Sequence, residues 1–177
     1  SVGTPGELQD LGGQEIEGNI TLTDDIDMTG VTMEPIKSLT GCFDGDGHTI
    51  SNLSLKGGNG TSTWQETTYV NTGLIGELNG SVINLKMANM SITDIGTVNN
   101  VGALVGKIAD GSTSRIDNCT ASGTIASTGG SGTTLIGGLV GYVTGAYQVY
   151  TTLTINNCVS NVTLSGASGN YVGGVVG

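Results

Sequence analysis

The sequence Gly-Gly-Leu-Val-Gly at residues 137–141 decides the fold, because it returns along the chain at a nearly constant spacing. Related copies read Gly-Leu-Ile-Gly at 73–76, Gly-Ala-Leu-Val-Gly at 102–106 and Gly-Gly-Val-Val-Gly at 173–177. Their central aliphatic residues are 30, 35 and 36 residues apart. A period of this length is typical of a solenoid, in which each repeat forms one turn of the chain.

A second motif runs in phase with the first and places an asparagine two positions after Ile or Val. Its four copies are Ile50-Ser-Asn52-Leu53, Val82-Ile-Asn84-Leu85, Ile116-Asp-Asn118-Cys119 and Ile155-Asn-Asn157-Cys158. The alternation of apolar and polar residues in such short segments is typical of β-strands. Glycine occupies 32 of the 177 positions, and each glycine would cost about 1 kcal/mol inside a helix.

These repeats predict an all-β chain, folded as a parallel β-helix (a β-solenoid) of about four to five coils with three short strands each. We expect an N-terminal cap over residues 1–19 and the solenoid over 20–177. The expected coils lie near residues 20–56, 73–101, 102–136 and 137–172, with a partial coil at 173–177.

Stacking of the coils predicts a row of asparagines, formed by Asn52, Asn84, Asn118 and Asn157. Stacked amides can satisfy one another along such a row. A neighbouring row would hold Leu53, Leu85, Cys119 and Cys158, with both cysteines acting as small buried apolar residues. A disulfide between Cys119 and Cys158 stays open as an alternative, because residues stacked in adjacent coils lie near the bridging distance.

The two ends of the predicted solenoid differ. Thr4-Pro5-Gly6-Glu7 is a capping box with proline at the first helical position, so we expect a short helix over residues 5–11 that covers the first coil. Residues 172–177 begin another repeat. The C-terminal edge is therefore expected either to be covered by further repeats or to associate end to end with another chain.

The charge is concentrated near the N-terminus. The chain has a formal net charge of −10, and ten of its fifteen acidic residues lie in the first 50 positions. This balance argues against nucleic acid as a partner. No apolar run approaches the roughly 20 residues of a membrane span, so we expect no membrane insertion.

The Gly-Gly-Leu-Val-Gly units, each tied to an Ile-x-Asn-Cys strand, resemble the GLUG-motif family of bacterial secreted and surface proteins. The segments 20–28 and 43–53 resemble the opening coil found ahead of such repeats, and 43–53 is also similar to a turn of pectate-lyase-like β-helices. The resemblance implies an extracellular or cell-surface location, no cofactor and no shared catalytic centre. It also implies that such repeats can occur beside peptidase or adhesin modules.

Few residues offer chemistry. His48 is the single histidine, and we expect it to follow a tight turn at 44–47 and begin a strand rather than to act in catalysis. No cluster of His and Cys has the spacing of metal ligands, so no metal site is predicted. Calcium near Asp25, Asp27 and Asp44 is a hypothesis that the sequence leaves open. A polysaccharide-degrading β-helix enzyme is the main catalytic alternative.

Two stretches that interrupt the repeat carry aromatic residues, namely Trp64 and Tyr69 in one and Tyr147 and Tyr150 in the other. Aromatic side chains on loops can stack on sugar rings or anchor a partner. We therefore expect a non-catalytic module for adhesion or display, with a glycan or an extracellular matrix protein as its partner. A structural spacer attached to a peptidase or adhesin is the other alternative.

Overall fold

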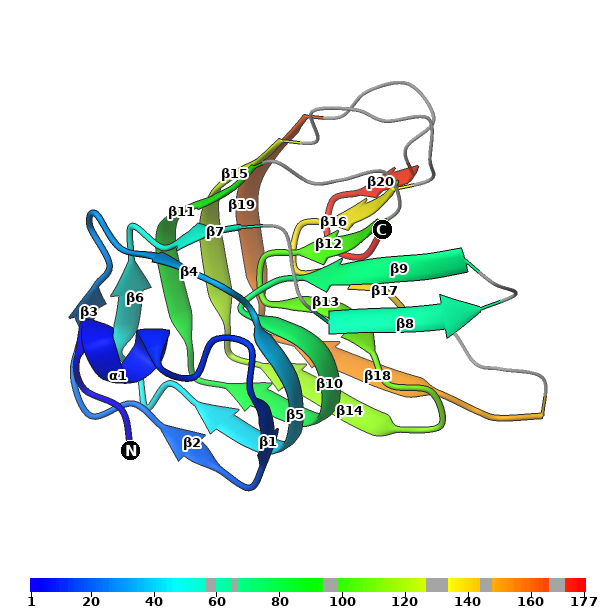
Figure 1. Cartoon of the computed structure of the whole chain (residues 1–177), viewed down its shortest axis with the longest axis horizontal. Coiled ribbons are helices and arrows are strands. Elements are labelled where there is room, and N and C mark those ends of the chain that lie inside the picture. Colours follow the sequence, from blue (N-terminus) through cyan, green and yellow to red (C-terminus); the bar gives the residue numbers. More distant parts are fainter. Residues whose placement is uncertain (57–59, 65–66, 94–98, 127–133, 144–147, 166–170) are drawn as a thin grey trace.

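The computed structural model describes residues 1–56, 60–64, 67–93, 99–126, 134–143, 148–165 and 171–177. Side chains are described over the same ranges except at 60–64, 67–69 and 99. The chain winds through three sheets in turn, and the N-terminal helix covers one end of the stack (Figure 1). The prediction of an all-β parallel solenoid with a short capping helix is confirmed.

The first sheet has eight strands, and each turn contributes either one long strand or two short ones. Ile36 of β5, Ile75 of β10 and Val105 of β13 occupy equivalent positions. The strands are β1 (Glu15–Glu17), β2 (Ile20–Thr21), β5 (Ile36–Asp44), β10 (Ile75–Ile83), β13 (Val105–Ile108), β14 (Thr113–Asp117), β17 (Val140–Tyr142) and β18 (Thr152–Asn156).

The second sheet has seven parallel strands and follows the first within each turn. Ile26, Ile50, Met87 and Ala121 align across it, and all four are buried. The strands are β3 (Ile26–Asp27), β4 (Thr32–Met33), β6 (Thr49–Ser51), β7 (Ser54–Leu55), β11 (Lys86–Ile92), β15 (Thr120–Ala126) and β19 (Val159–Ser165).

The third sheet has five strands and begins in the second turn. It contains β8 (Gly60–Trp64), β9 (Thr67–Thr72), β12 (Asn99–Gly102), β16 (Thr134–Gly137) and β20 (Tyr171–Gly173). Strands β9, β12, β16 and β20 pair in parallel, whereas β8 pairs with β9 in an antiparallel hairpin at the edge of this sheet.

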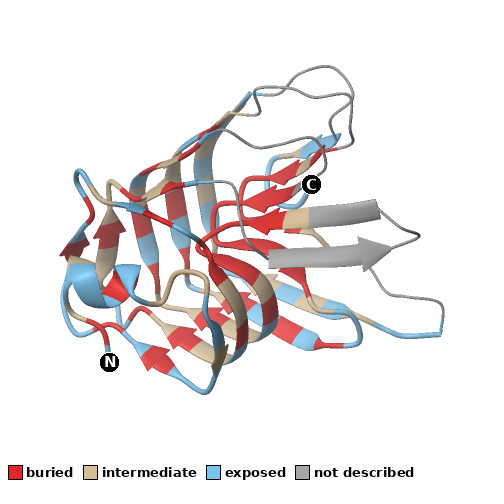
Figure 2. Ribbon diagram, viewed as in Figure 1, coloured by how far each residue is buried: buried red, intermediate tan, exposed pale blue. Residues whose placement is uncertain are grey.

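The core lies between the sheets and runs along the whole stack (Figure 2). Inward side chains of consecutive turns lie above one another, so an aliphatic residue at one position in each repeat forms a continuous apolar row. Leu39, Leu78 and Ile108 form one such row and are completely buried.

The repeated glycine motif forms the corner between the third sheet and the first. A Cβ atom at Gly106 would lie 2.6 Å from the backbone nitrogen of Thr72, and one at Gly73 would lie 2.8 Å from the carbonyl oxygen of Gly102. A Cβ at Gly137 would collide with the carbonyl oxygen of Val140. The motif therefore requires glycine because the backbones of two strands touch at this corner.

The N-terminal cap contains helix α1 (Pro5–Gln9), which ends two residues before the predicted boundary at Leu11. Thr4 Oγ1 accepts a hydrogen bond from Glu7 N at 3.3 Å, and Glu7 Oε2 accepts one from Thr4 N at 3.1 Å. Leu8 is completely buried. Val2 pairs with Leu22, so the segment before the helix also covers the first turn.

The first turn differs from the expected boundaries. Residues 20–56, expected as one coil, hold strands of two successive turns, β2–β4 and β5–β7, and β1 lies inside the expected cap. These first strands have two or three residues each. They also lack the glycine motif, so the sequence repeat does not separate them from the second turn.

Candidate functional site

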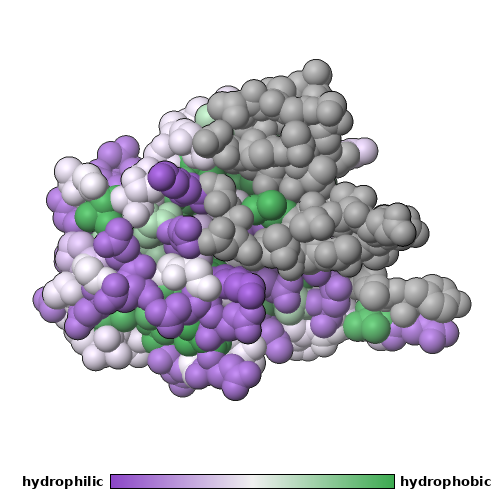
Figure 3. All heavy atoms as spheres, in the orientation of Figure 1, coloured by the Kyte–Doolittle hydropathy of each residue, from purple (hydrophilic) through white to green (hydrophobic). Residues whose placement is uncertain are grey.

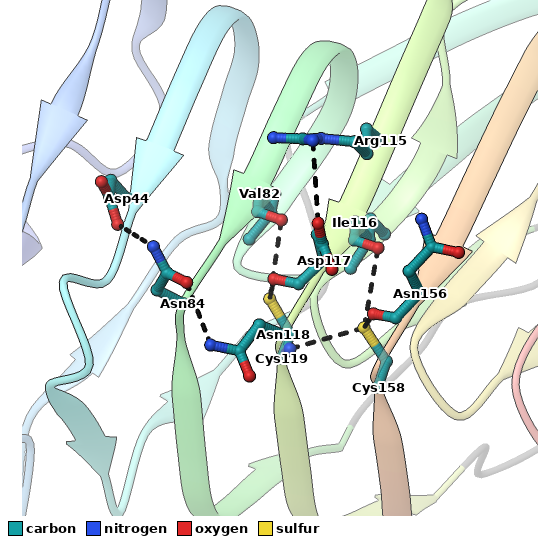
Figure 4. Close-up of polar contacts among 10 residues, drawn as sticks. All are labelled: Asp44, Val82, Asn84, Arg115, Ile116, Asp117, Asn118, Cys119, Asn156 and Cys158. Carbon is teal, nitrogen blue, oxygen red and sulfur yellow. Dashed lines mark hydrogen bonds and ion pairs between the residues drawn. The ribbon is translucent and has the colours of Figure 1, made fainter.

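The most regular polar feature is a ladder of side chains along the corner after the first sheet (Figure 4). The amide nitrogen of Asn118 donates to Asn84 Oδ1 at 3.0 Å, and the amide nitrogen of Asn84 donates to Asp44 Oδ1 at 3.1 Å. Each amide thus donates to the previous turn, and the series ends on a carboxylate. This arrangement satisfies three polar side chains at once.

A second ladder, with the same direction, lies at a corner within the second sheet. Asn89 Nδ2 donates to Asn52 Oδ1 at 2.7 Å, and Asn52 Nδ2 donates to Asp27 Oδ1 at 2.8 Å and to Thr29 Oγ1 at 3.0 Å. Both ladders therefore begin at an aspartate in the N-terminal turns.

The expected single row of asparagines is therefore split, because Asn52 does not lie with Asn84. In the pairing of β6 with β11, Ile50 is opposite Met87, which aligns Asn52 with Asn89. The counterpart of Val82 is Phe43. The segment Ile50–Leu53 resembles the asparagine motif in sequence but belongs to the next sheet, and Leu53 accordingly lies outside the row of Leu85.

The backbone explains why asparagine recurs at these corners. Asn52, Asn84, Asn118 and Asn157 have φ angles of 56°, 53°, 55° and 51°, and Asn89 has 53°. Asparagine tolerates this left-handed conformation better than most residues with a side chain. Its amide can also bond along the stack, which glycine cannot do.

Cys119 and Cys158 occupy equivalent positions in adjacent turns, and both are free thiols. The Cys119 thiol donates to the carbonyl oxygens of Asp117 at 3.3 Å and Val82 at 3.6 Å, and the Cys158 thiol donates to those of Asn156 and Ile116 at 3.0 and 3.6 Å. The Cys119 amide donates to Cys158 Sγ at 3.4 Å. Burial raises the pKa of the Cys119 thiol to about 12, so this group is not a nucleophile at neutral pH.

A third asparagine pair was not predicted. Asn100 Nδ2 donates to Asn71 Oδ1 at 2.8 Å, and both residues are buried. Asn100 Oδ1 has no hydrogen-bond partner among the described residues. The signal was present in the sequence, since Asn71 and Asn100 each lie two positions before the first glycine of a repeat. Leu135 replaces asparagine in the next turn.

Each of the three aspartates of the calcium hypothesis accepts a hydrogen bond from another residue of the chain. Asp25 Oδ1 accepts from Thr49 N at 2.7 Å, and this bond, followed by the interaction with His48, holds the pKa of Asp25 below its usual value. The bond from Asn52, followed by those from Thr29, lowers the pKa of Asp27. In the described part of the chain, no group of three or more His, Cys, Asp or Glu side chains could hold a metal ion.

His48 lies next to this group and follows a turn that contains Asp46, with φ 47°, and Gly47, with φ 82°. Its Nδ1 is 3.4 Å from Asp25 Oδ1. The strand after the turn begins at Thr49, one residue later than predicted. Position and partner give His48 a structural role at the turn.

Lys107 is a buried cation that the sequence analysis did not single out. Its ammonium group is 3.3 Å from Asp110 Oδ2 and 3.8 Å from Glu77 Oε2. Only 9% of its side chain is exposed. Because a buried charge is costly without partners, these two carboxylates compensate the cost of burying the ammonium group.

Three of the four aromatic residues proposed for binding have a described backbone, two of them in the β8–β9 hairpin and one before β18. Trp64 is the last residue of β8, opposite Thr67, and Tyr69 lies in β9 opposite Ser62. The side chains of both residues, and the whole of Tyr147, fall outside the described part of the structure. Tyr150 precedes β18 and is 89% exposed. Hydrophilic side chains dominate the described surface in Figure 3, with small hydrophobic patches between them.

Comparison with known proteins places this geometry in context. Residues 97–126 match the family model described as the GLUG motif, so the chain carries this motif and the predicted resemblance is confirmed. These residues span β12 to β15, and they include the glycine corner and the Ile-x-Asn-Cys segment.

Over 114 residues, or 62% of its length, the chain is 43% identical to Halomucin of Haloquadratum walsbyi, and it spans 1% of the length of that protein. The fold is similar to the crystal structure of a Bacteroides ovatus protein provisionally named an immunoglobulin A1 protease, with a TM-score of 0.50 and 18% identity. That match covers 99% of this chain and 70% of the other. Among the described residues, no helix is long and apolar enough to cross a membrane.

Proposed function

We propose that this chain is a non-catalytic display module of an extracellular or cell-surface protein. The observation that carries the proposal is the use of the polar side chains. The amides of Asn52, Asn84, Asn89 and Asn118 and the carboxylates of Asp27 and Asp44 are bonded to neighbouring turns. These polar side chains hold neighbouring turns together, as is expected of a rigid scaffold.

The GLUG motif and the identity with Halomucin support a surface location. The acidic balance of the chain agrees with this, because a net charge far from zero keeps an exported protein soluble. The buried and hydrogen-bonded state of Cys119 means that this thiol does not depend on a reducing environment.

We further propose that recognition, where it occurs, uses the aromatic residues Trp64, Tyr69, Tyr147 and Tyr150. The β8–β9 hairpin and the segment before β18 are additions to the repeated turn, so they can vary without disturbing the core. An aromatic ring offers a large apolar face at small cost in conformational entropy, which suits the stacking of a sugar or an anchor in a protein groove.

An array of glycans and matrix proteins tests this assignment. Binding by the wild-type chain, lost in the Trp64→Ala, Tyr147→Ala double variant and in Tyr150→Ala, would support adhesion through these residues. Trp64→Phe and Tyr150→Phe are the matched controls, because they keep a ring at each position and should retain most of the binding. Binding that persists in the alanine variants would remove the aromatic residues from the proposal.

The catalytic alternative has a separate test. The structural similarity to the Bacteroides ovatus protein is at 18% identity and concerns the fold alone. Incubation with immunoglobulin A1 and with acidic polysaccharides should yield no fragments and no unsaturated sugars. Release of either product, abolished by a single substitution in the chain, would contradict the non-catalytic assignment.

A further inference from the structure

Several asparagines of this chain begin the sequence Asn-x-Ser/Thr, which is the acceptor of N-linked glycans in exported proteins. They are Asn19, Asn52, Asn59, Asn79, Asn89, Asn118 and Asn161. A composition rich in asparagine, serine and threonine produces such sequences by chance, so the sequence alone does not separate acceptors from structural residues. The hydrogen bonds and the exposure of each side chain do separate them.

Three of these asparagines use the atom to which a glycan would be attached. The Nδ2 atoms of Asn52, Asn89 and Asn118 each donate a hydrogen bond to an oxygen of the previous turn. A glycan on Nδ2 replaces one of its two protons and adds a bulky group beside the neighbouring turn. The ladders therefore assign these three side chains to the structure and not to modification.

Asn79 has the opposite properties. It is exposed, and its side chain has no hydrogen-bond partner among the described residues. It lies in β10, which pairs with β5 on one side and with β13 and β14 on the other (Figure 1). Thr40, which pairs with Asn79, and Glu17, which pairs with Thr40, are exposed as well. A glycan on Asn79 would therefore extend into solvent from the outer face of the first sheet.

The residues around Asn79 also fit an acceptor. Leu78 is completely buried in the core row, so the packing of this turn does not depend on the Asn79 side chain. Gly80 has no side chain that could obstruct a sugar. Ser81 supplies the hydroxyl group of the acceptor sequence, and this partly exposed hydroxyl has no hydrogen-bond partner among the described residues. The fold thus uses neither polar side chain of the acceptor sequence.

The remaining acceptor sequences support a weaker argument. Asn19 is exposed, but its Oδ1 accepts a hydrogen bond from Cys42 N at 3.0 Å, which holds the amide against β5. Asn161 is exposed, but among the described residues its strand, β19, pairs on one side only. Asn59 lies outside the described residues. Asn79 is therefore the acceptor that combines a free side chain with a strand paired on both edges.

We propose that Asn79 carries an N-linked glycan. The inference rests on the proposed extracellular location, because the sugar donor, an oligosaccharide on a lipid phosphate, and its transferase act on exported chains. In the transfer, Nδ2 of Asn79 forms a bond to the anomeric carbon and gives up one proton to water. The bond from that carbon to the phosphate oxygen breaks, and the lipid phosphate leaves. Transfer precedes folding, since both edges of β10 are paired in the folded chain.

Mass spectrometry of glycopeptides from the protein isolated from its native cells tests the proposal, with fragmentation that keeps the sugar on its side chain. The expected result is a sugar chain on Asn79 and none on Asn52, Asn89 or Asn118. A sugar on any of those three ladder residues would contradict the argument from hydrogen bonding. A bare Asn79 in protein recovered from the cell surface would overturn this inference and leave the proposed display function standing. Bare protein found only in the cytoplasm would contradict both.

Substitutions in the acceptor sequence provide matched controls in the same cells. Asn79→Gln and Ser81→Ala each destroy the acceptor sequence at a side chain without a hydrogen-bond partner among the described residues, so both variants should fold. Both should lose the glycan from this segment, whereas Ser81→Thr restores the acceptor sequence and should keep it. A glycan that persists in Asn79→Gln and Ser81→Ala would lie on another residue and would overturn the assignment.

Discussion

The first turn of this chain and the last turn that the structure describes differ in how their inner side chains are covered. The first turn, residues 15–33, has short strands, many acidic residues and a helical cap whose Leu8 is buried. The last turn, residues 140–173, has longer strands with no charge, and its core rows stay partly exposed. A turn of a solenoid buries its inner side chains fully only where it is covered on both sides, and in the first turn the helical cap covers one side.

The largest effect on the free energy of unfolding should come from replacing leucine with alanine in a covered turn rather than in the last turn. Leu22, in the covered first turn, and the central Leu78 are completely buried, whereas Leu164 of β19 is only partly buried. Leu78→Ala and Leu22→Ala should each lower the free energy of unfolding by about 2–5 kcal/mol. Leu164→Ala should cost much less. Urea denaturation of the three variants at low protein concentration measures the difference, and equal losses would show that the last turn is not open.

Alanine substitutions compare a glycine that is packed against neighbouring backbone with a glycine that has free space around it. A Cβ atom at Gly106 would meet the backbone of the previous turn, whereas one at Gly174 would meet nothing within 4 Å. Gly106→Ala should therefore lower the free energy of unfolding by about 1–3 kcal/mol through overpacking. Gly174→Ala should leave it nearly unchanged. Thermal melts followed by circular dichroism provide the comparison, and a neutral Gly106→Ala would contradict the role assigned to the glycine motif.

Substitutions in the asparagine ladder separate two contributions to stability, that of the backbone conformation and that of the side-chain hydrogen bonds. Asn84→Gly keeps the left-handed backbone at little cost but removes the bonds to Asp44 and Asn118, and should lower the free energy of unfolding by about 1 kcal/mol. Asn84→Ala should cost roughly 1 kcal/mol more, because φ is 53°. At Asn157, in the last turn, alanine should exceed glycine in cost by a similar amount, because φ is 51° there. Identical effects of both substitutions at Asn84 would contradict this division.

Acid should affect the first turn before the last. Hydrogen bonds from Gly3 and Thr4 lower the pKa of Glu7, a bond from Thr49 lowers that of Asp25, and a bond from Asn52 lowers that of Asp27. A lowered carboxyl pKa stabilises the fold above the pKa of the unfolded chain, and this stabilisation is lost as pH falls through the lower, folded value. The N-terminal cap should therefore loosen below about pH 4.

Amide exchange measured at several acidic pH values checks the prediction, with the uncharged last turn as the internal control. Loss of protection in the last turn before the first would contradict it.

The smallest effect concerns the thiols. Burial raises the pKa of Cys119 to about 12, so its thiolate is scarce at pH 8. Cys158 lies at the partly exposed end of the same row. Iodoacetamide should therefore modify Cys158 in the native chain and leave Cys119 unmodified, as mass spectrometry of peptides would show. Modification of both at the same rate would mean that the last turn opens easily.

The sequence predicted the solenoid because two motifs repeat in register, and both motifs report backbone requirements. Glycine is needed where strands touch, as at Gly106, and asparagine is needed where φ is positive, as at Asn84. Such requirements are local and can be recognised in a single sequence. The capping box at Thr4 and Glu7 is local as well.

The predictions from sequence were wrong or incomplete where the alignment of one turn with the next decides which residues are neighbours. Asn52 has the sequence of the asparagine motif but the position of Asn89, because pairing is set by which apolar residues stack and not by the motif itself. The burial of Lys107 depends on Glu77, which lies 30 residues earlier. The first turn could not be found because it lacks the glycine corner.

The most direct test of the difference between the two ends is residue-specific amide hydrogen exchange at low protein concentration. The amides of Leu22 and Met28, which donate to the second turn, should be strongly protected, whereas those of Ser160, Val162 and Leu164 should exchange rapidly. That result would show that the helical cap protects the first turn, whereas the outward peptide groups of β19 have no partner among the described residues. Equal protection at both ends, or faster exchange in the first turn, would contradict it.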